Sequence, residues 1–218
     1  MKHTVAISTK ICGLTTAEHA NLAAFYGARW LGFVFFERSP RNLTLDAAAN
    51  LRPHLPKRGE RVGVFVNAEH NFIEAAVDAL DLDWVQLHGD EYPHEAQLLK
   101  ARLGISVIKA LGVSSREDLR QADLFAPHVD AILFDAKPPK GAILPGGNAV
   151  SFPWHILNGE KLPYPWLLAG GLTAENLPRA IAESNAQAVD ISSGVESAPG
   201  QKSGEKIEAF LRTAKAVR

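Results

Sequence analysis

The stretch KICGLTTAEHANLAAF, residues 10–25, shows the local pattern on which the whole chain is built. A short apolar run ends at Cys12 and Gly13, and a segment rich in alanine follows after two threonines. The stretch LLAGGLTAENL, residues 167–177, repeats this order near the other end of the chain, with two glycines and no thiol. Each stretch predicts a strand that turns at glycine into a helix. We expect the two turns to lie at the same end of one fold.

The strand-and-helix pattern recurs along the whole chain. Eight short apolar, β-branched runs predict strands, at residues 5–11, 31–36, 61–66, 84–88, 106–111, 131–135, 166–170 and 188–192. Eight segments with helical start signals or helical spacing alternate with them, at residues 19–27, 45–55, 69–80, 93–102, 115–125, 153–158, 174–183 and 203–217. Strands that are apolar on both faces are typical of a parallel sheet covered by helices. Because the alternation leaves no obvious edge strand, it favours a closed (β/α)8 TIM barrel over an open doubly wound sheet.

Length and composition indicate one soluble globular domain over residues 1–218. The chain is 46% hydrophobic and 22% charged, and it contains no linker rich in glycine, proline or serine. Its net charge is -1 with both signs interleaved, so we expect neither a nucleic-acid partner nor a membrane partner. The N-terminus lacks an apolar signal region, and no apolar run is long enough to span a membrane, which favours a cytoplasmic location. A monomer and a homodimer both fit the sequence.

The last two predicted βα turns suggest a phosphate site. Gly170 and Gly171 follow the seventh strand, while Ser193 and Gly194 follow the eighth. Glycines let a backbone approach an anion closely, and the helix that Thr173 could cap supplies N–H donors. Either pair alone is more typical of a tight βα turn than of a phosphate site. Together, at the two turns where barrels commonly bind phosphate, they predict a phosphorylated small molecule as the ligand.

Cys12 and Asp135 end the first and sixth predicted strands, where the functional residues of a βα barrel gather. A lone cysteine is more often a small buried apolar residue, and an aspartate is often a helix cap. In a closed barrel, however, these two strands form nearly opposite walls, so a thiol and a carboxyl group could address one substrate from two sides. Such a pair suits acid–base chemistry, with the thiolate favoured by a nearby positive charge. Lys10 points to the same face of the strand as Cys12 and is one source of that charge, or else a structural lysine of the barrel.

Arg41 and His88 complete the candidate site. Arg38 and Arg41 follow the second strand, and a guanidinium group at this end of the barrel suits a substrate carboxylate, although exposed loop arginines are common. His88 ends the fourth strand and is either a substrate contact or a polar residue of the rim. A metal site is not expected, because His88, Asp90 and Glu91 follow no known ligand spacing and the single cysteine excludes a multi-thiolate site.

The long connection at 136–152 is the only one of its length in the chain. A connection this long in a compact domain is typical of a lid or binding loop, and it is also compatible with a surface insertion.

The motifs at these positions resemble those of the phosphoribosylanthranilate isomerase family. They run in order over nearly the whole chain: KICGLT at 10–15, GFVFFERSPR at 32–41, RVGVFVN at 61–67, VQLHGDE at 85–91, ILFDAKPP at 132–139, LAGGLTAENL at 168–177 and AVDISSGVESAPGQKS at 188–203. The resemblance implies a (β/α)8 barrel of tryptophan biosynthesis that needs no cofactor. It implies an Amadori isomerisation of N-(5-phosphoribosyl)anthranilate to 1-(2-carboxyphenylamino)-1-deoxyribulose 5-phosphate.

Specific roles follow from the same resemblance. Cys12 matches the general base and Asp135 the general acid, while Arg41 matches the arginine that binds the anthranilate carboxylate. Gly171 and the Ser193–Gly194 turn match the phosphate site. The role of Asp190, within the VDISSG block, stays open.

The chain departs from the family in the loop after the sixth strand. Many members carry a run like GGTGKTFDW, whereas residues 146–154 read GGNAVSFPW, with Ala149 in place of a glycine and Pro153 in place of an acid. Two other functions remain as alternatives. One is another phosphosugar enzyme on the same barrel, such as indole-glycerol-phosphate synthase or a metal-dependent ribulose-phosphate epimerase. The other is a barrel that binds phosphate without catalysis.

Overall fold

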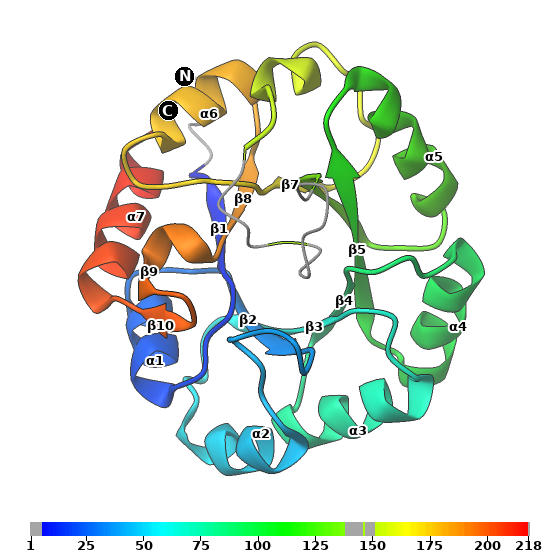
Figure 1. Cartoon of the computed structure of the whole chain (residues 1–218), viewed down its shortest axis with the longest axis vertical. Coiled ribbons are helices and arrows are strands. Elements are labelled where there is room, and N and C mark those ends of the chain that lie inside the picture. The colour runs from blue at the N-terminus through cyan, green and yellow to red at the C-terminus, as the bar shows by residue number, and fades with distance from the viewer. Residues whose placement is uncertain (1–5, 138–145, 147–150, 218) are drawn as a thin grey trace.

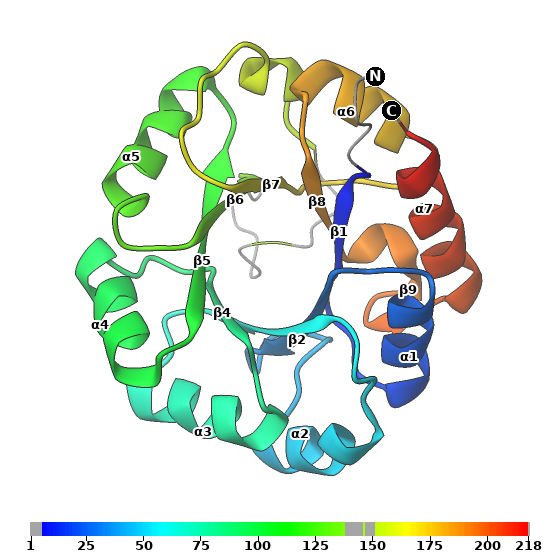
Figure 2. The same ribbon diagram turned by 180° about the vertical axis from the view of Figure 1, so that it is seen from behind.

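The computed structural model describes residues 6–137, 146 and 151–217. Eight parallel strands close into a barrel in chain order, because β8 pairs with β1 (Figures 1 and 2). The strands are β1 Ser8–Ile11, β2 Trp30–Phe35, β3 Glu60–Phe65, β4 Trp84–Leu87, β5 Ser106–Val113, β6 Ala131–Ala136, β7 Trp166–Leu168 and β8 Ala188–Ile191. The predicted TIM barrel is confirmed.

Burial on both faces explains the near-continuous apolar character of the strands. Every residue of β2 and β6 is buried. Side chains at alternate positions point into the barrel, and the others pack beneath the helices. One apolar cluster fills much of the barrel interior. It is made of Trp30, Val62, Ile108, Ala110, Ala131, Leu133, Leu167, Ala169 and Ala188. A smaller cluster of Cys12, Val34 and Val64 lies closer to the ends of the strands. The barrel interior is therefore a packed core, with a pocket at its C-terminal mouth.

Helices form the outer ring of the barrel (Figure 1). The α-helices are α1 Ala17–Phe25, α2 Leu45–Leu51, α3 His70–Leu80, α4 Pro93–Leu103, α5 Gln121–Phe125, α6 Leu177–Ser184 and α7 Gly204–Ala216. The 3-10 helices are η1 Arg52–His54, η2 Arg116–Arg120, η3 Trp154–Leu157 and η4 Ser193–Val195. Thr16 caps α1 by accepting a hydrogen bond from the backbone N–H of His19. In the described part of the chain, no helix is both long and apolar enough to cross a membrane.

Three of the predicted helical segments take a different form. The segment at 45–55 is divided into α2 and η1 and the segment at 115–125 into η2 and α5, while the segment at 153–158 is only the four-residue 3-10 helix η3. Pro153 precedes η3 and Gly159 follows it closely, which leaves no room for a longer α-helix. Trp154 and Leu157 of η3 are nevertheless buried, so this short turn covers the barrel as a helix would.

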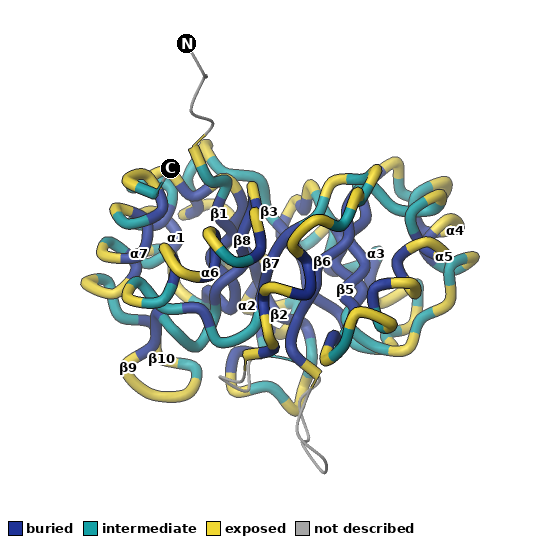
Figure 3. The backbone as a smooth tube through the Cα atoms, turned by 90° about the horizontal axis from the view of Figure 1, so that it is seen from above, coloured by how far each residue is buried: buried dark blue, intermediate teal, exposed yellow. Residues whose placement is uncertain are grey.

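A small antiparallel hairpin after β8 was not among the predicted strands. It consists of β9 Glu196–Ala198 and β10 Gln201–Lys202, joined through Gly200 at φ +81°. Strands this short carry no periodic pattern that a sequence reveals. Figure 3 shows the hairpin as a largely exposed lobe whose roots are buried.

Most of the long connection lies outside the described residues. This applies to 138–145 and 147–150, and therefore to Ala149 and to the predicted lid or binding loop. Gly146 is described, and it lies at the mouth of the barrel.

Candidate active site

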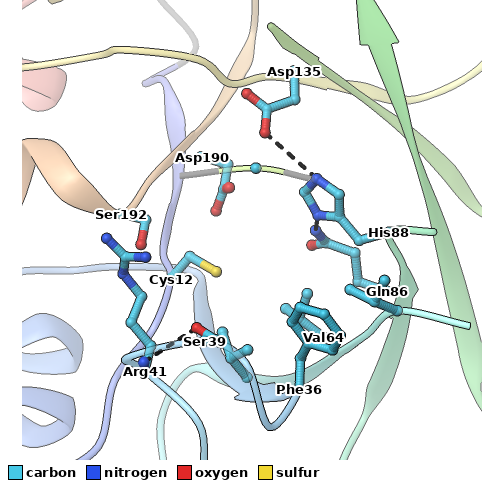
Figure 4. Close-up of a pocket in the computed structure, with 13 residues that line it drawn as sticks. Cys12, Phe36, Ser39, Arg41, Val64, Gln86, His88, Asp135, Asp190 and Ser192 are labelled. Carbon is cyan, nitrogen blue, oxygen red and sulfur yellow. Dashed lines mark hydrogen bonds and ion pairs between the residues drawn. The ribbon is translucent and has the colours of Figure 1, made fainter. Parts of the chain in front are cut away.

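A pocket opens where the barrel strands end (Figure 4). Its lining comes from β2, β3, β4, β6 and β8 and from the segments that follow these strands and β1. It consists of Cys12, Val34, Phe36, Ser39, Arg41, Val64, Val66, Gln86, His88, Asp135, Gly146, Asp190 and Ser192. Four residues that the sequence analysis selected, Cys12, Arg41, His88 and Asp135, therefore line one cavity. Apolar side chains from β2 and β3 form part of the wall between the polar groups.

Cys12 faces this pocket rather than the helices. It follows β1 directly, and Asp135 lies near the end of β6, on a distant wall of the closed barrel. Both are almost completely buried, with exposed fractions of 7% each. Figure 4 shows the sulfur and the carboxyl group at separate sides of the pocket. A sugar ring bound between them would meet a thiol on one side and a carboxyl group on the other.

Lys10 lies beneath Cys12 and is fully buried. Its Nζ donates to Oδ1 of Asp190 over 2.9 Å. Burial opposes the charge of Lys10, but Asp190 and Cys12 together hold the pKa of Lys10 above its usual value. The pKa of Cys12 is also raised, because burial outweighs the positive charges of Lys10 and Lys202. The expected positive charge is present, yet the thiol is the favoured form of Cys12 in the substrate-free protein.

His88 stands beside Asp135. Nε2 of His88 lies 3.5 Å from Oδ2 of Asp135, and Oδ1 of Asp135 accepts a hydrogen bond from the backbone N–H of Ala136. On its other side, Nδ1 of His88 lies 2.9 Å from Nε2 of Gln86. With the amide nitrogen as donor, Nδ1 accepts, and Nε2 carries the proton that points toward Asp135. Gln86 is a site residue that sequence reasoning missed, because an interior strand position by itself predicts only packing.

Arg41 is held by a carboxylate that was not singled out in the sequence. Its Nε and Nη2 each donate to an oxygen of Glu196 over 2.7 Å. Lys202 donates to the same carboxylate over 2.7 Å and to the backbone carbonyl of Ser192 over 2.9 Å. All three charged residues are buried. The arginine predicted to bind a substrate carboxylate is thus fixed at the wall of the pocket by the β9–β10 hairpin.

The conformation and surroundings of Gly13 explain why a glycine follows Cys12. Its φ is +76°, and a Cβ at this position would lie 2.5 Å from Cδ of Arg41. The turn after Cys12 therefore needs glycine both for its backbone conformation and for the passage of the arginine.

A second hollow lies between the loops after β7 and β8. It is lined by Gly171, Leu172, Thr173, Ala174, Glu175, Ser193, Gly194, Lys206 and Ala209. The two loops touch, because a Cβ on Gly194 would lie 1.9 Å from the carbonyl oxygen of Leu172. Asn176 rather than Thr173 is the N-cap residue of α6, and the two residues exchange hydrogen bonds. Gly171, Ser193 and Gly194 thus line one cavity, and Lys206 is a lining residue that sequence reasoning missed.

Gly170 contacts different atoms from those around Gly171. A Cβ at Gly170 would lie 2.9 Å from the backbone nitrogen of Ala136 and 3.2 Å from Oδ1 of Asp135. Gly170 therefore lies behind the carboxyl group of Asp135, and it does not line the hollow between the loops.

Comparison with known proteins gives one consistent result. The sequence model of the family described as N-(5'phosphoribosyl)anthranilate (PRA) isomerase matches residues 9–213. The chain is 47% identical over 212 residues to the N-(5'-phosphoribosyl)anthranilate isomerase of Paramagnetospirillum magneticum, covering 97% of this chain and 99% of that protein. Its fold is similar to that of phosphoribosyl anthranilate isomerase from Thermotoga maritima, with a TM-score of 0.86, 36% identity and coverage of 96% and 99% of the two chains.

A further solved structure shows an isomerase of this kind in complex with reduced 1-(o-carboxyphenylamino)-1-deoxyribulose 5-phosphate. It has a TM-score of 0.83 and 34% identity, and the match covers 96% of this chain and 99% of that one. The resemblance inferred from the sequence motifs is confirmed. The chain belongs to the N-(5'-phosphoribosyl)anthranilate isomerase family.

Proposed function

We propose that this protein converts N-(5-phosphoribosyl)anthranilate into 1-(2-carboxyphenylamino)-1-deoxyribulose 5-phosphate in tryptophan biosynthesis, with Cys12 as general base and Asp135 as general acid. The observation that carries the assignment of roles is the shared pocket, in which these two groups approach from separate walls of the barrel. Membership of the isomerase family supports the choice of reaction. The proposal includes a cytoplasmic location and requires no cofactor.

The first step opens the sugar ring. Asp135 gives its proton to the furanose oxygen, the bond between this oxygen and C1 breaks, and the anthranilate nitrogen supplies an electron pair to form a protonated Schiff base. Asp135 is then a carboxylate beside His88, and a proton on Nε2 of His88 stabilises the new charge at a distance of 3.5 Å. His88 also lines the pocket, where it can contact the sugar.

The second step moves hydrogen from C2 to C1. Cys12, as the thiolate, takes the proton from C2, and the released electron pair forms the double bond between C1 and C2 while neutralising the Schiff base. The resulting enolamine tautomerises to the ketone by gaining a proton at C1 and losing the hydroxyl proton at C2. Because the thiol form is favoured in the substrate-free protein, proton loss from Cys12 is part of the energetic cost of the reaction.

The two ends of the substrate have separate sites in this proposal. Arg41 binds the anthranilate carboxylate from the wall of the pocket. The phosphate lies in the hollow between the loops after β7 and β8, with Gly171, Ser193 and Gly194 providing close backbone approach. Holding both ends places the ribose between Cys12 and Asp135.

A direct assay tests the proposal. Purified protein is added to freshly generated phosphoribosylanthranilate, and the change in anthranilate fluorescence is followed with wild type and with Cys12→Ser. Catalytic turnover by wild type, with loss of turnover in Cys12→Ser, supports the function and the role of the base. Binding of a product analogue by a wild-type protein that shows no turnover would instead identify a non-catalytic barrel.

A further inference from the structure

The carboxylate of Glu196 has an unusually complete set of partners. Its Oε1 accepts from Nε of Arg41 and from Nζ of Lys202, both over 2.7 Å. Its Oε2 accepts from Nη2 of Arg41 over 2.7 Å and from the backbone N–H of Gly200 over 3.3 Å. Both oxygens are therefore fully used inside the protein, and Glu196 itself is not among the residues that line the pocket.

Arg41 has only part of its guanidinium group engaged by this carboxylate. Nε and Nη2 form the fork with Glu196, and within the described residues no partner is recorded for Nη1. A two-point contact fixes the plane of a guanidinium group, which a single contact cannot do. The remaining N–H groups of Arg41 then have a defined direction at the pocket wall.

The charges of the cluster still suit an anionic ligand. Arg41 and Lys202 carry two positive charges against the one negative charge of Glu196. Their exposed fractions are 5% for Arg41 and 7% each for Glu196 and Lys202, so solvent screens this balance only weakly. Burial opposes ionisation of Glu196, but the hydrogen bonds from Arg41 and Lys202 together hold the pKa of Glu196 below its usual value. Burial is the largest influence on Lys202 and lowers its pKa, so the guanidinium group of Arg41 is the charge on which an anionic ligand depends.

Close backbone contacts on both sides reinforce the position of the arginine. The stem of Arg41 passes directly over Gly13, where a Cβ would lie 2.5 Å from Cδ. On the hairpin, a Cβ on Gly200 would lie 2.5 Å from the carbonyl oxygen of Pro40, the residue before Arg41. The hairpin that carries Glu196 is thus packed against the loop that carries Arg41.

We propose that Glu196 is a positioning residue that aims Arg41 at the carboxylate of the substrate, so that the β9–β10 hairpin determines selectivity for an anthranilate group. This inference rests on the proposed function for the identity of the ligand. The competing explanation is that Glu196 only stabilises the fold of the hairpin.

The test compares binding of two ligands that differ in one group. They are reduced 1-(o-carboxyphenylamino)-1-deoxyribulose 5-phosphate and the same molecule with phenyl in place of carboxyphenyl. The selectivity ratio is the Kd of the phenyl ligand divided by the Kd of the carboxylated ligand. In Glu196→Gln an amide NH₂ group replaces one of the two carboxylate oxygens. This NH₂ group faces an N–H donor, so the two-point contact with Arg41 is lost. We expect the ratio to fall by roughly tenfold in Glu196→Gln, the loss of one well-placed charge-assisted contact.

A matched control separates positioning from stability. Glu91 is another carboxylate at the same end of the barrel, with a side chain only 8% exposed, and it accepts from Lys109 over 2.7 Å without contacting Arg41. Glu91→Gln should lower the unfolding midpoint, as Glu196→Gln does, while keeping the wild-type selectivity ratio. Glu196→Asp, whose shorter side chain cannot reach the same fork, should lower the ratio as well, and it replaces Glu196→Gln if that variant does not fold.

A double-mutant comparison completes the test. If Glu196 acts through Arg41, the variant with both Arg41→Ala and Glu196→Gln has the selectivity ratio of Arg41→Ala alone. Three results would overturn the inference. The first is a wild-type selectivity ratio in Glu196→Gln, the second is that the effects of the two substitutions multiply in the double variant, and the third is that the wild type shows no selectivity. Failure of the wild type to isomerise phosphoribosylanthranilate overturns the proposed function instead, because the selectivity ratio is a binding measurement that needs no turnover.

Discussion

Nζ of Lys10 and Oδ1 of Asp190 lie 2.9 Å apart inside the barrel and join its first strand to its last. The two residues are paired in register across β1 and β8, the strands whose contact closes the barrel. Lys10 is fully buried, and Asp190 is 8% exposed. The ion pair therefore joins the strands that close the barrel and also reaches the pocket, because Asp190 lines the pocket together with Cys12.

Lys10→Met should destabilise the protein strongly, since it leaves Asp190 as a buried charge without its cation. Removing one partner of a buried pair costs roughly 3–5 kcal/mol. The variant with both Lys10→Met and Asp190→Asn should be more stable than Lys10→Met alone, because it no longer contains the orphaned charge. Urea unfolding of the wild type, both single variants and the double variant measures this coupling. A loss below roughly 1 kcal/mol in Lys10→Met, the value of an exposed pair, would contradict it.

Cys12→Ala should retain the fold and lose turnover by roughly two to four orders of magnitude, the usual contribution of a general base. The substitution removes one sulfur atom at the pocket and leaves Gly13 and its turn intact. The measurements are kcat on phosphoribosylanthranilate and the Kd of the reduced product analogue. Unchanged binding with lost turnover fits the proposed role, whereas near-normal kcat would refute it.

Asp135→Asn should block ring opening, because an amide cannot supply the proton that the ring oxygen needs. We expect kcat to fall by roughly two to four orders of magnitude, as for the base. His88→Gln is the comparison variant. It keeps Asp135 and replaces the imidazole, including the Nδ1 atom that faces Gln86, with an amide whose NH₂ group can still point toward the carboxylate, so its loss of kcat should be clearly smaller. Equal losses in the two variants would mean that proton transfer needs His88 as much as Asp135, which contradicts Asp135 as the sole general acid.

The fold was accessible from the sequence because its pattern is local. Each strand is a short apolar run, and turns such as the one at Gly13 show the change from strand to helix. The β9–β10 hairpin was not predicted, and the helix predicted at 153–158 is only the 3-10 helix η3, since two to four residues cannot display a period. Their conformations depend on what they pack against, as with Trp154, which is buried under its neighbours.

The sequence predicted which residues lie at strand ends much better than it predicted which distant residues contact one another. The rule that barrels function at their C-terminal mouth selected Cys12 and Asp135, and both line the pocket. The contact of Arg41 with Glu196 spans 155 positions, and no local pattern in either segment requires the other. A sequence therefore identifies candidate groups by location, whereas their partners, and hence their charges and directions, follow only from the closed barrel.

The pH dependence of activity should reflect the raised pKa of Cys12. A base must be deprotonated to act, so kcat/KM should keep rising with pH beyond about 8.5, where an ordinary thiol titrates. Stability should change in the opposite sense. Between the unfolded and folded pKa values, the unfolded chain has lost the thiol proton and the folded protein retains it, so the free energy of unfolding falls as pH rises.

Comparison with Cys12→Ala isolates this effect from the other groups that titrate at alkaline pH. The difference in unfolding free energy between wild type and Cys12→Ala should shrink from about pH 8 to about pH 10 in urea titrations. A difference that stays constant over this range, together with a kcat/KM that levels off below about pH 8, would show that Cys12 has no raised pKa.

Gly194→Ala should weaken binding of the phosphate end of the substrate. The added methyl group would lie 1.9 Å from the carbonyl oxygen of Leu172, so the loops after β7 and β8 must separate. We expect a rise in KM for phosphoribosylanthranilate and a weaker inhibition by inorganic phosphate. Ser193→Ala is the milder control, since it removes one hydroxyl from the same hollow without forcing the loops apart. If Gly194→Ala loses stability but keeps the wild-type inhibition constant for phosphate, the hollow between these loops does not hold the phosphate.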